Sequence, residues 1–227
     1  MQEPQVIELT ASDVHWPMDN NPPYLMIGGG RYPRRTNIDP FPCYPHDLGL
    51  VKDLVTEITE LWPIPFETKF YVLHFETPDR TNGWAQMDAI EYDGKGGVKE
   101  WAASIALQGK RIPVHPAMTR YLVPHECGHL VEDAINASRG EHADNRKILQ
   151  EYAALRGMEC KDLAEGGTWH QHVGEIFAND FRILVAKREV EFWPHSGIPR
   201  PENLAAVIEW WEARKAELME VQSAVAV

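Results

Sequence analysis

The sequence lacks the features of several protein classes. No apolar run approaches the roughly 18 residues that a membrane-spanning helix needs. Its three cysteines, Cys43, Cys127 and Cys160, are odd in number and irregularly spaced, which does not describe a disulfide framework. Positive charge is also scarce, because 22 Lys and Arg stand against 34 Asp and Glu, for a net charge of −12. We therefore expect neither nucleic acid nor a membrane as the main partner.

The N-terminal residues Met-Gln-Glu-Pro-Gln have neither the basic nor the apolar region of a signal peptide. We therefore expect a cytoplasmic protein, or one exported by another route. A length of 227 residues fits one domain with a sizeable core. Residues 1–46 are rich in proline and predict an N-terminal arm of that domain, and residues 47–227 predict its main body. The sequence predicts no oligomeric state.

One stretch carries a recognisable chemistry, Pro124-His125-Glu126-Cys127-Gly128-His129. It contains His-Glu-x-x-His, which binds zinc when it lies on a helix. Residues four apart point almost the same way, so His125 and His129 would present two imidazoles to one metal ion. Glu126 points to the neighbouring side, where it could reach a water activated by the zinc. Zinc lowers the pKa of such a water to about 7, and Glu126 could accept its proton.

The surroundings of the motif favour a helix over residues 117–136. Apolar residues precede and follow it at the spacing of a buried helix. Gly128 removes a side chain between the two histidines, which suits a close approach to the zinc or to a packed strand. Pro124 is expected in the first turn of the helix, or at a kink there. Helical geometry turns Cys127 away from the metal, so we expect it in the core.

Three candidates exist for a third metal ligand. The metzincin class is excluded, because Glu132 and Ile135 stand where it requires Gly and His. Glu141 and His142 lie in a stretch that predicts a loop. The best candidate is Glu175, which lies in a second helical pattern. Asn179 follows one turn later and could accept a hydrogen bond from the far nitrogen of a metal-bound histidine.

These residues resemble a known family. The runs His125-Glu-Cys-Gly-His129-Leu-Val131-Glu-Asp133 and Glu175-Ile-Phe-Ala178-Asn-Asp-Phe181 are similar to the gluzincin metallopeptidases. Among them they most resemble the protease domain of anthrax lethal factor and the Pro-Pro endopeptidases. The resemblance covers roughly residues 118–187. It implies an α+β, zincin-like domain, in which a small mixed sheet packs on an active-site helix and a second metal-ligand helix.

The resemblance also implies an activity, zinc-dependent hydrolysis of protein or peptide substrates. His125, His129 and Glu175 would bind the zinc, and Glu126 would be the general base and acid. The family places a tyrosine two turns before the zinc-binding glutamate, where it stabilises the oxyanion. Thr168 stands at that position here. His172, His170 and Tyr152 are the candidates for that role, and we take His172 as the catalytic one.

Periodicity predicts the remaining elements. Helices are expected over residues 46–61, 144–156, 170–187 and 201–221, and strands over residues 6–9, 24–27, 69–75, 87–92 and 101–107. The last two strands predict a hairpin. By the resemblance, residues 101–108 would form the edge strand beside the zinc and pair with an extended substrate. An interior strand is the alternative.

Two other functions fit the same motif. In one, the protein cleaves a single dedicated partner protein inside the cell, as gluzincin-type regulators of phage repressors do. In the other, a structural zinc holds two helices together and the protein is a binding module. A structural site has no use for Glu126 and would need four protein ligands. His172 as a fourth ligand would favour this last function.

Overall fold

The structure is a computed structural model of residues 1–227. The residues that it describes are 5–10, 24–27, 30–33, 43–62, 68–76, 82–92, 98–139, 147–158, 172–184, 195 and 197–225. They form two compact units. The first comprises residues 1–56 and 66–126, and the second comprises residues 57–65 and 127–227. The predicted division into an arm and one main domain stays a prediction.

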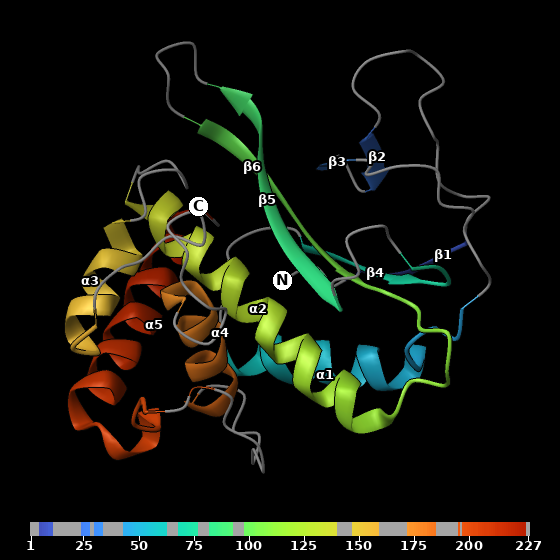
Figure 1. Ribbon diagram of the computed structural model, residues 1–227. Coiled ribbons are helices and arrows are strands. Elements are labelled where there is room, and N and C mark those ends of the chain that lie inside the picture. The colour runs from blue at the N-terminus through green and yellow to red at the C-terminus, as the bar shows by residue number, and fades with distance from the viewer. Residues whose placement is uncertain are drawn as a thin grey trace. The chain divides into compact units, whose positions relative to one another are not determined.

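The first unit contains the strands, which belong to two sheets (Figure 1). The strands are β1 (Gln5–Leu9), β2 (Tyr24–Ile27), β3 (Gly30–Pro33), β4 (Thr68–Leu73), β5 (Gly83–Tyr92) and β6 (Val98–Leu107). The strands β2 and β3 form an antiparallel pair. The other four form one sheet in the order β1-β4-β6-β5. Except for β3, which was not predicted, every strand was expected from the sequence.

The four-stranded sheet is mixed. β1 and β6 run parallel to β4, whereas β5 runs antiparallel to β6. The long hairpin of β5 and β6, shown in green in Figure 1, confirms the predicted pairing of the two strands. The prediction that residues 101–108 form the edge strand is wrong, because β6 lies between β4 and β5. Apolar residues fill both faces of β6 near its end, as is usual for an interior strand.

Helix α1 (Leu48–Leu61) ends where the sequence predicts and begins at Leu48 rather than at the predicted residue 46. The side chain of Asp47 accepts a hydrogen bond of 2.8 Å from the backbone N–H of Leu50, which caps the first turn. Val51, Leu54, Val55 and Ile58 form the buried stripe expected from their spacing. In the sheet, a cluster of Tyr71, Leu73, Phe75 and Ala106 is covered by residues of β1 and β5.

Helix α2 (Pro116–Ser138) carries the His-Glu-x-x-His motif. Pro116 occupies the first helical position, where the missing N–H of proline costs nothing. His115 precedes it, and its ring Nδ1 accepts a hydrogen bond of 3.2 Å from the N–H of Ala117. The expectation for Pro124 is wrong, since it lies inside the helix rather than in its first turn. The helix starts earlier than Pro124 requires because His115 and Pro116 together provide a better N-terminus.

The second unit is helical in its described residues. It contains α3 (Lys147–Leu155), α4 (Val173–Leu184), the 3₁₀ helix η4 (Pro201–Asn203) and α5 (Ala205–Val225), as well as the last turn of α1 and most of α2. Gly157, with φ of 65°, ends α3 as predicted. α3, α4 and α5 lie side by side in Figure 1 and enclose an aromatic core. Its rings are those of Trp62, Tyr152, Phe177, Phe181, Trp210 and Trp211.

The described part of the chain is thus an α+β protein with a mixed four-stranded sheet and five α-helices, which confirms the predicted class. Within that part, no helix has both the length and the apolar character needed to cross a membrane.

Candidate metal centre

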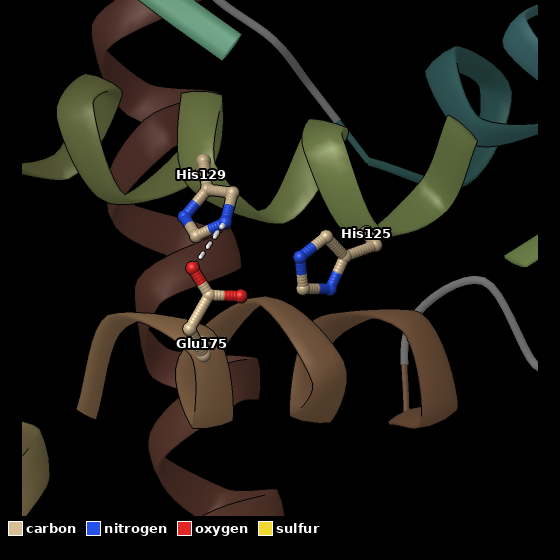
Figure 2. Close-up of side chains that lie close together, drawn as sticks. All are labelled: His125, His129 and Glu175. Carbon is tan, nitrogen blue, oxygen red and sulfur yellow. Dashed lines mark ion pairs between the residues drawn. The ribbon is translucent and has the colours of Figure 1, made fainter. Parts of the chain in front are cut away.

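Helix α2 presents both motif histidines on one side, as Figure 2 shows. His125 is buried, with 4% of its surface exposed. Its ring stacks on that of Tyr121, one turn earlier, with the centroids 5.6 Å apart and the planes 19° from parallel. Nearer the start of the helix, Thr119 shares a hydrogen bond of 2.8 Å with the buried ring of His46. These contacts fix the orientation of α2 within the first unit and of the His125 ring.

Helix α4 supplies Glu175 from its first turn. Gly128 of α2 faces Ala178 of α4 so closely that a Cβ on Gly128 would lie 2.6 Å from the Cα of Ala178. Only glycine permits this approach, because real Cβ atoms do not come within 3.0 Å of such a neighbour. Gly128 thus allows a close approach as predicted, but the element that approaches it is the helix of Glu175 and not a strand.

The close packing brings the three predicted ligands together. One ligand atom from each of His125, His129 and Glu175 lies within 4.8 Å of the other two. The carboxylate Oε1 of Glu175 lies 3.8 Å from Nε2 of His129, the ion pair dashed in Figure 2. Two ligands bound tetrahedrally to zinc lie about 3.4 Å apart, given zinc–ligand bonds of about 2.1 Å. The group therefore fits a divalent metal ion after small side-chain adjustments, and its N and O donors suit zinc.

Asn179 supports the helix of Glu175 in a way that the sequence did not predict. Its amide nitrogen donates to the backbone carbonyl of Glu175 at 2.9 Å and lies 2.9 Å from Nε2 of His195. Its carbonyl oxygen accepts two hydrogen bonds from the buried guanidinium of Arg182, at 3.0 and 3.2 Å. These bonds hold the first turn of α4, and the expected hydrogen bond from a metal-bound histidine to Asn179 stays a prediction. No spacing rule pointed to His195, which follows Trp193-Pro194.

Glu126 follows His125 on α2 and is 5% exposed. It is not one of the three residues that could hold the metal, which agrees with the separate role predicted for it. Its carboxylate lies on the side of α2 that faces Gly83, the first residue of β5. Glu126 is thus a buried carboxylate that adjoins one of the three candidate metal ligands in the sequence.

His172 lies immediately before α4, and its backbone carbonyl accepts a hydrogen bond from the N–H of Ile176. Its ring lies beside Gly174, which Glu132 of α2 also approaches. Both ring nitrogens are buried and have no hydrogen-bond partner within the described part of the chain. His172 does not belong to the group of three metal ligands. Whether it is a fourth ligand stays a prediction, and its two ring nitrogens have no partner among the described residues.

Tyr152 is excluded as the oxyanion donor. Its ring is completely buried, and its hydroxyl donates a hydrogen bond to the carboxylate of Asp180 and accepts one of 3.2 Å from Trp211. The sequence alone does not determine which way the side chain of Tyr152 points. In the structure it packs into the core of the second unit. The remaining candidate for that role, His170, lies outside the described residues, as do Thr168, which stands at the position of the family's tyrosine, and the alternative ligands Glu141 and His142.

Comparison of the sequence with protein-family models and with curated proteins finds no match.

Proposed function

We propose that this protein is a zinc-dependent endopeptidase. The observation that carries the proposal is the convergence of His125, His129 and Glu175 within 4.8 Å of one another. The spacing of the two histidines on α2 with Glu126 between them supports a catalytic rather than a structural metal. The same residues are those that resemble the gluzincin metallopeptidases. The mixed sheet followed by the motif helix is compatible with the zincin-like fold that this resemblance implies.

The chemistry divides among the residues of the centre. A zinc ion bound by the three ligands supplies Lewis-acid activation of a water and of the scissile carbonyl. Glu126 accepts the proton of the attacking water and returns it to the leaving amine. His172 donates a hydrogen bond to the oxygen that becomes negatively charged. His125 and His129 would bind the metal through their ring nitrogens, and Glu175 would neutralise part of its charge.

The edge of the sheet offers a place for an extended substrate. Within the described sheet, β5 has a neighbour on one side only, which is β6. β5 thereby takes the role that the sequence assigned to residues 101–108. Glu126 lies beside Gly83, so the start of β5 is next to the general base. A peptide paired with β5 would bring its backbone to the residues that act on it.

A second candidate is the cleavage of one dedicated partner protein by the same centre. The chemistry would be identical, and only the range of substrates would differ. A purely structural zinc is less well supported, because three protein ligands leave one position of a tetrahedral ion open. The buried carboxylate of Glu126 would also have no role in a structural site.

The test is hydrolysis of a diverse peptide library by the zinc-loaded protein and by its Glu126→Gln variant. We expect the wild type to cut and the variant to lose about 10²- to 10⁴-fold in kcat while it still binds zinc. Glu60→Gln is the matched control, because Glu60 is exposed on α1 and loses the same charge. Zinc content of all three proteins is measured by competition with a chromophoric chelator.

Three outcomes separate the candidates. Library cleavage that disappears in Glu126→Gln supports the general endopeptidase. No library cleavage, with zinc bound and a single cellular protein cut by the wild type only, supports the dedicated protease. If neither peptides nor proteins are cut by the zinc-loaded wild type, the proposal of a peptidase is wrong.

A further inference from the structure

Gly83 is the first residue of β5 and pairs with Leu107 of β6 in the antiparallel register. A Cβ built on it would lie 3.0 Å from Oε1 and 3.4 Å from Cδ of Glu126. The carboxylate of Glu126 therefore rests against bare backbone at the start of β5. Gly83 and Glu126 both belong to the first unit.

The backbone of Gly83 does not itself require glycine. The described glycines with positive φ are Gly157 and Gly197, and Gly83 is in extended strand conformation. Glycine in a strand weakens it through its flexibility, and it often marks a place where another group approaches closely. The group that approaches here is the carboxylate of Glu126. The reason for glycine at this position is therefore the space that it leaves.

A side chain at position 83 would have one way to make room. The same Cβ would lie 3.0 Å from the backbone oxygen of Ala106, which is in β6 and paired on both sides. That oxygen is held by the sheet, whereas the end of the Glu126 side chain can rotate. The carboxylate would therefore move, and the metal ligands His125, His129 and Glu175 are not among the atoms that the Cβ would meet.

We infer that Gly83 is a positioning residue for Glu126: its bare backbone sets where the carboxylate of the general base rests. This inference depends on the proposed function for its kinetic consequence, but not for its structural one. Because a displacement of about 1 Å can cost 10²-fold in rate, a shift of a few tenths of an ångström in this carboxylate should have a smaller but measurable effect on proton transfer. A change at Gly83 should alter catalysis without altering metal binding.

The test compares Gly83→Ala with the wild type in three measurements. Gly83→Ala should lower kcat by roughly 3- to 10-fold with little change in KM, since Glu126 acts in the transition state and its carboxylate has to move by only a few tenths of an ångström. Its zinc affinity should stay within about twofold of the wild type, because no ligand is touched. A crystal structure of the metal-free variant should show the Glu126 carboxylate moved away from β5. Gly49→Ala, at an exposed position of α1, is the control for replacing a glycine.

A double-mutant cycle distinguishes positioning from general damage. In the Glu126→Asp background the carboxylate is one methylene shorter, so Gly83→Ala should cost little further activity. If Gly83→Ala fails to fold, Glu126→Asp should restore folding, since it removes the clash. If the double variant also fails to fold, the added methyl group clashes with the backbone oxygen of Ala106 rather than with Glu126, and the inference is overturned.

The remaining outcomes are also decisive. Full activity of Gly83→Ala, or a crystal structure with Glu126 unmoved, overturns the inference and leaves the peptidase proposal standing. The inference is also overturned if Gly83→Ala lowers activity by the same factor in the wild type and in the Glu126→Asp variant. If the wild type cuts nothing, the proposed function fails, and the crystal structure of Gly83→Ala alone decides whether Gly83 positions Glu126.

Discussion

The three candidate metal ligands differ in their exposure. His125 is 4% exposed, whereas the side chains of His129 and Glu175 keep 25% and 16% of their surface. Solvent therefore reaches the ligand group from the side of His129 and Glu175, and His125 anchors it on the buried side. A catalytic metal needs such an open side, because water and substrate must both reach it.

The role of His172 is tested by His172→Ala. We expect kcat to fall by about 10²- to 10³-fold, which is the usual cost of removing one oxyanion donor. Zinc affinity should not change, because His172 is not part of the ligand group. Peptide hydrolysis and zinc competition are measured together. His74→Ala is the control, because His74 lies outside the motif and its ring contacts Glu8. A fall in zinc affinity would instead identify His172 as a ligand.

At the scale of elements, the contact between α2 and α4 decides whether the ligand group forms. Gly128 and Ala178 let the two helices approach, and Asn179 secures the first turn of α4 by its bond to the carbonyl of Glu175. The position of Glu175 relative to His129 therefore depends on residues that never touch the metal. Such supporting contacts commonly change metal affinity by 10- to 100-fold.

Gly128→Ala is the corresponding prediction. The added methyl group would overlap the backbone of Ala178, so the helices must separate or the protein must bear the strain. We expect a loss of about 1–3 kcal/mol in the free energy of unfolding, together with a 10- to 100-fold weaker zinc affinity. Urea unfolding without metal and chelator competition with zinc measure the two effects. Unchanged zinc affinity would show that the helix contact does not set the ligand geometry.

A buried polar network joins α3, α4 and α5. Tyr152 donates to Asp180, the Nε of Arg156 lies 3.4 Å from the same carboxylate, and Trp211 donates to Tyr152. Arg156 also donates to the backbone carbonyl of Pro199 at 2.7 Å. The network fixes the packing of these helices, since removing one member would leave buried charge without its partner.

At the scale of the whole molecule, two buried groups make stability depend on pH in opposite directions. Burial, with the nearby charge of Lys110, lowers the pKa of His46 from 6.5 to about 4. The unfolded chain binds a proton there below pH 6.5 and the folded protein does not. The stability contributed by neutral His46 is thus present above pH 6.5 and is lost as the pH falls towards 4, by about 3 kcal/mol.

Asp180 acts in the other direction. Burial raises the pKa of its carboxyl from 3.8 to about 7, although Arg156 and the bond from Tyr152 oppose the rise. The folded protein therefore keeps a proton that the unfolded chain loses above pH 3.8. This contribution to stability is full below pH 3.8 and is lost as the pH rises through 7.

Single substitutions should separate the two effects. Between pH 7 and pH 4.5, His46→Gln should gain stability relative to the wild type, because it no longer has the acid-sensitive group. Asp180→Asn should lose stability relative to the wild type over the same range. Urea unfolding in the presence of a chelator measures both and removes any contribution of metal. Profiles parallel to that of the wild type would contradict the assigned pKa shifts.

The sequence by itself predicted the residues that carry local signals. The spacing of His125 and His129 fixed their common direction on a helix, and the helical pattern around Glu175 placed the third ligand on another. The stripe of α1 and the hairpin of β5 and β6 followed from periodicity in the same way. These predictions depend on neighbours within a few residues, where helix and strand geometry leave few choices.

Only the tertiary structure decided the features that depend on distant parts of the chain. Whether β6 or β5 lies at the edge depends on which strands pair, and β4 occupies the second side of β6. Tyr152 packs into the core against the aromatic rings of α4 and α5, and Asn179 lies against His195, 16 positions further along the chain. The closeness of Gly83 to Glu126 likewise arises from the packing of β5 against α2. No local pattern encodes these contacts, because each joins residues that lie far apart in the sequence, where helix and strand geometry no longer fixes their relative positions.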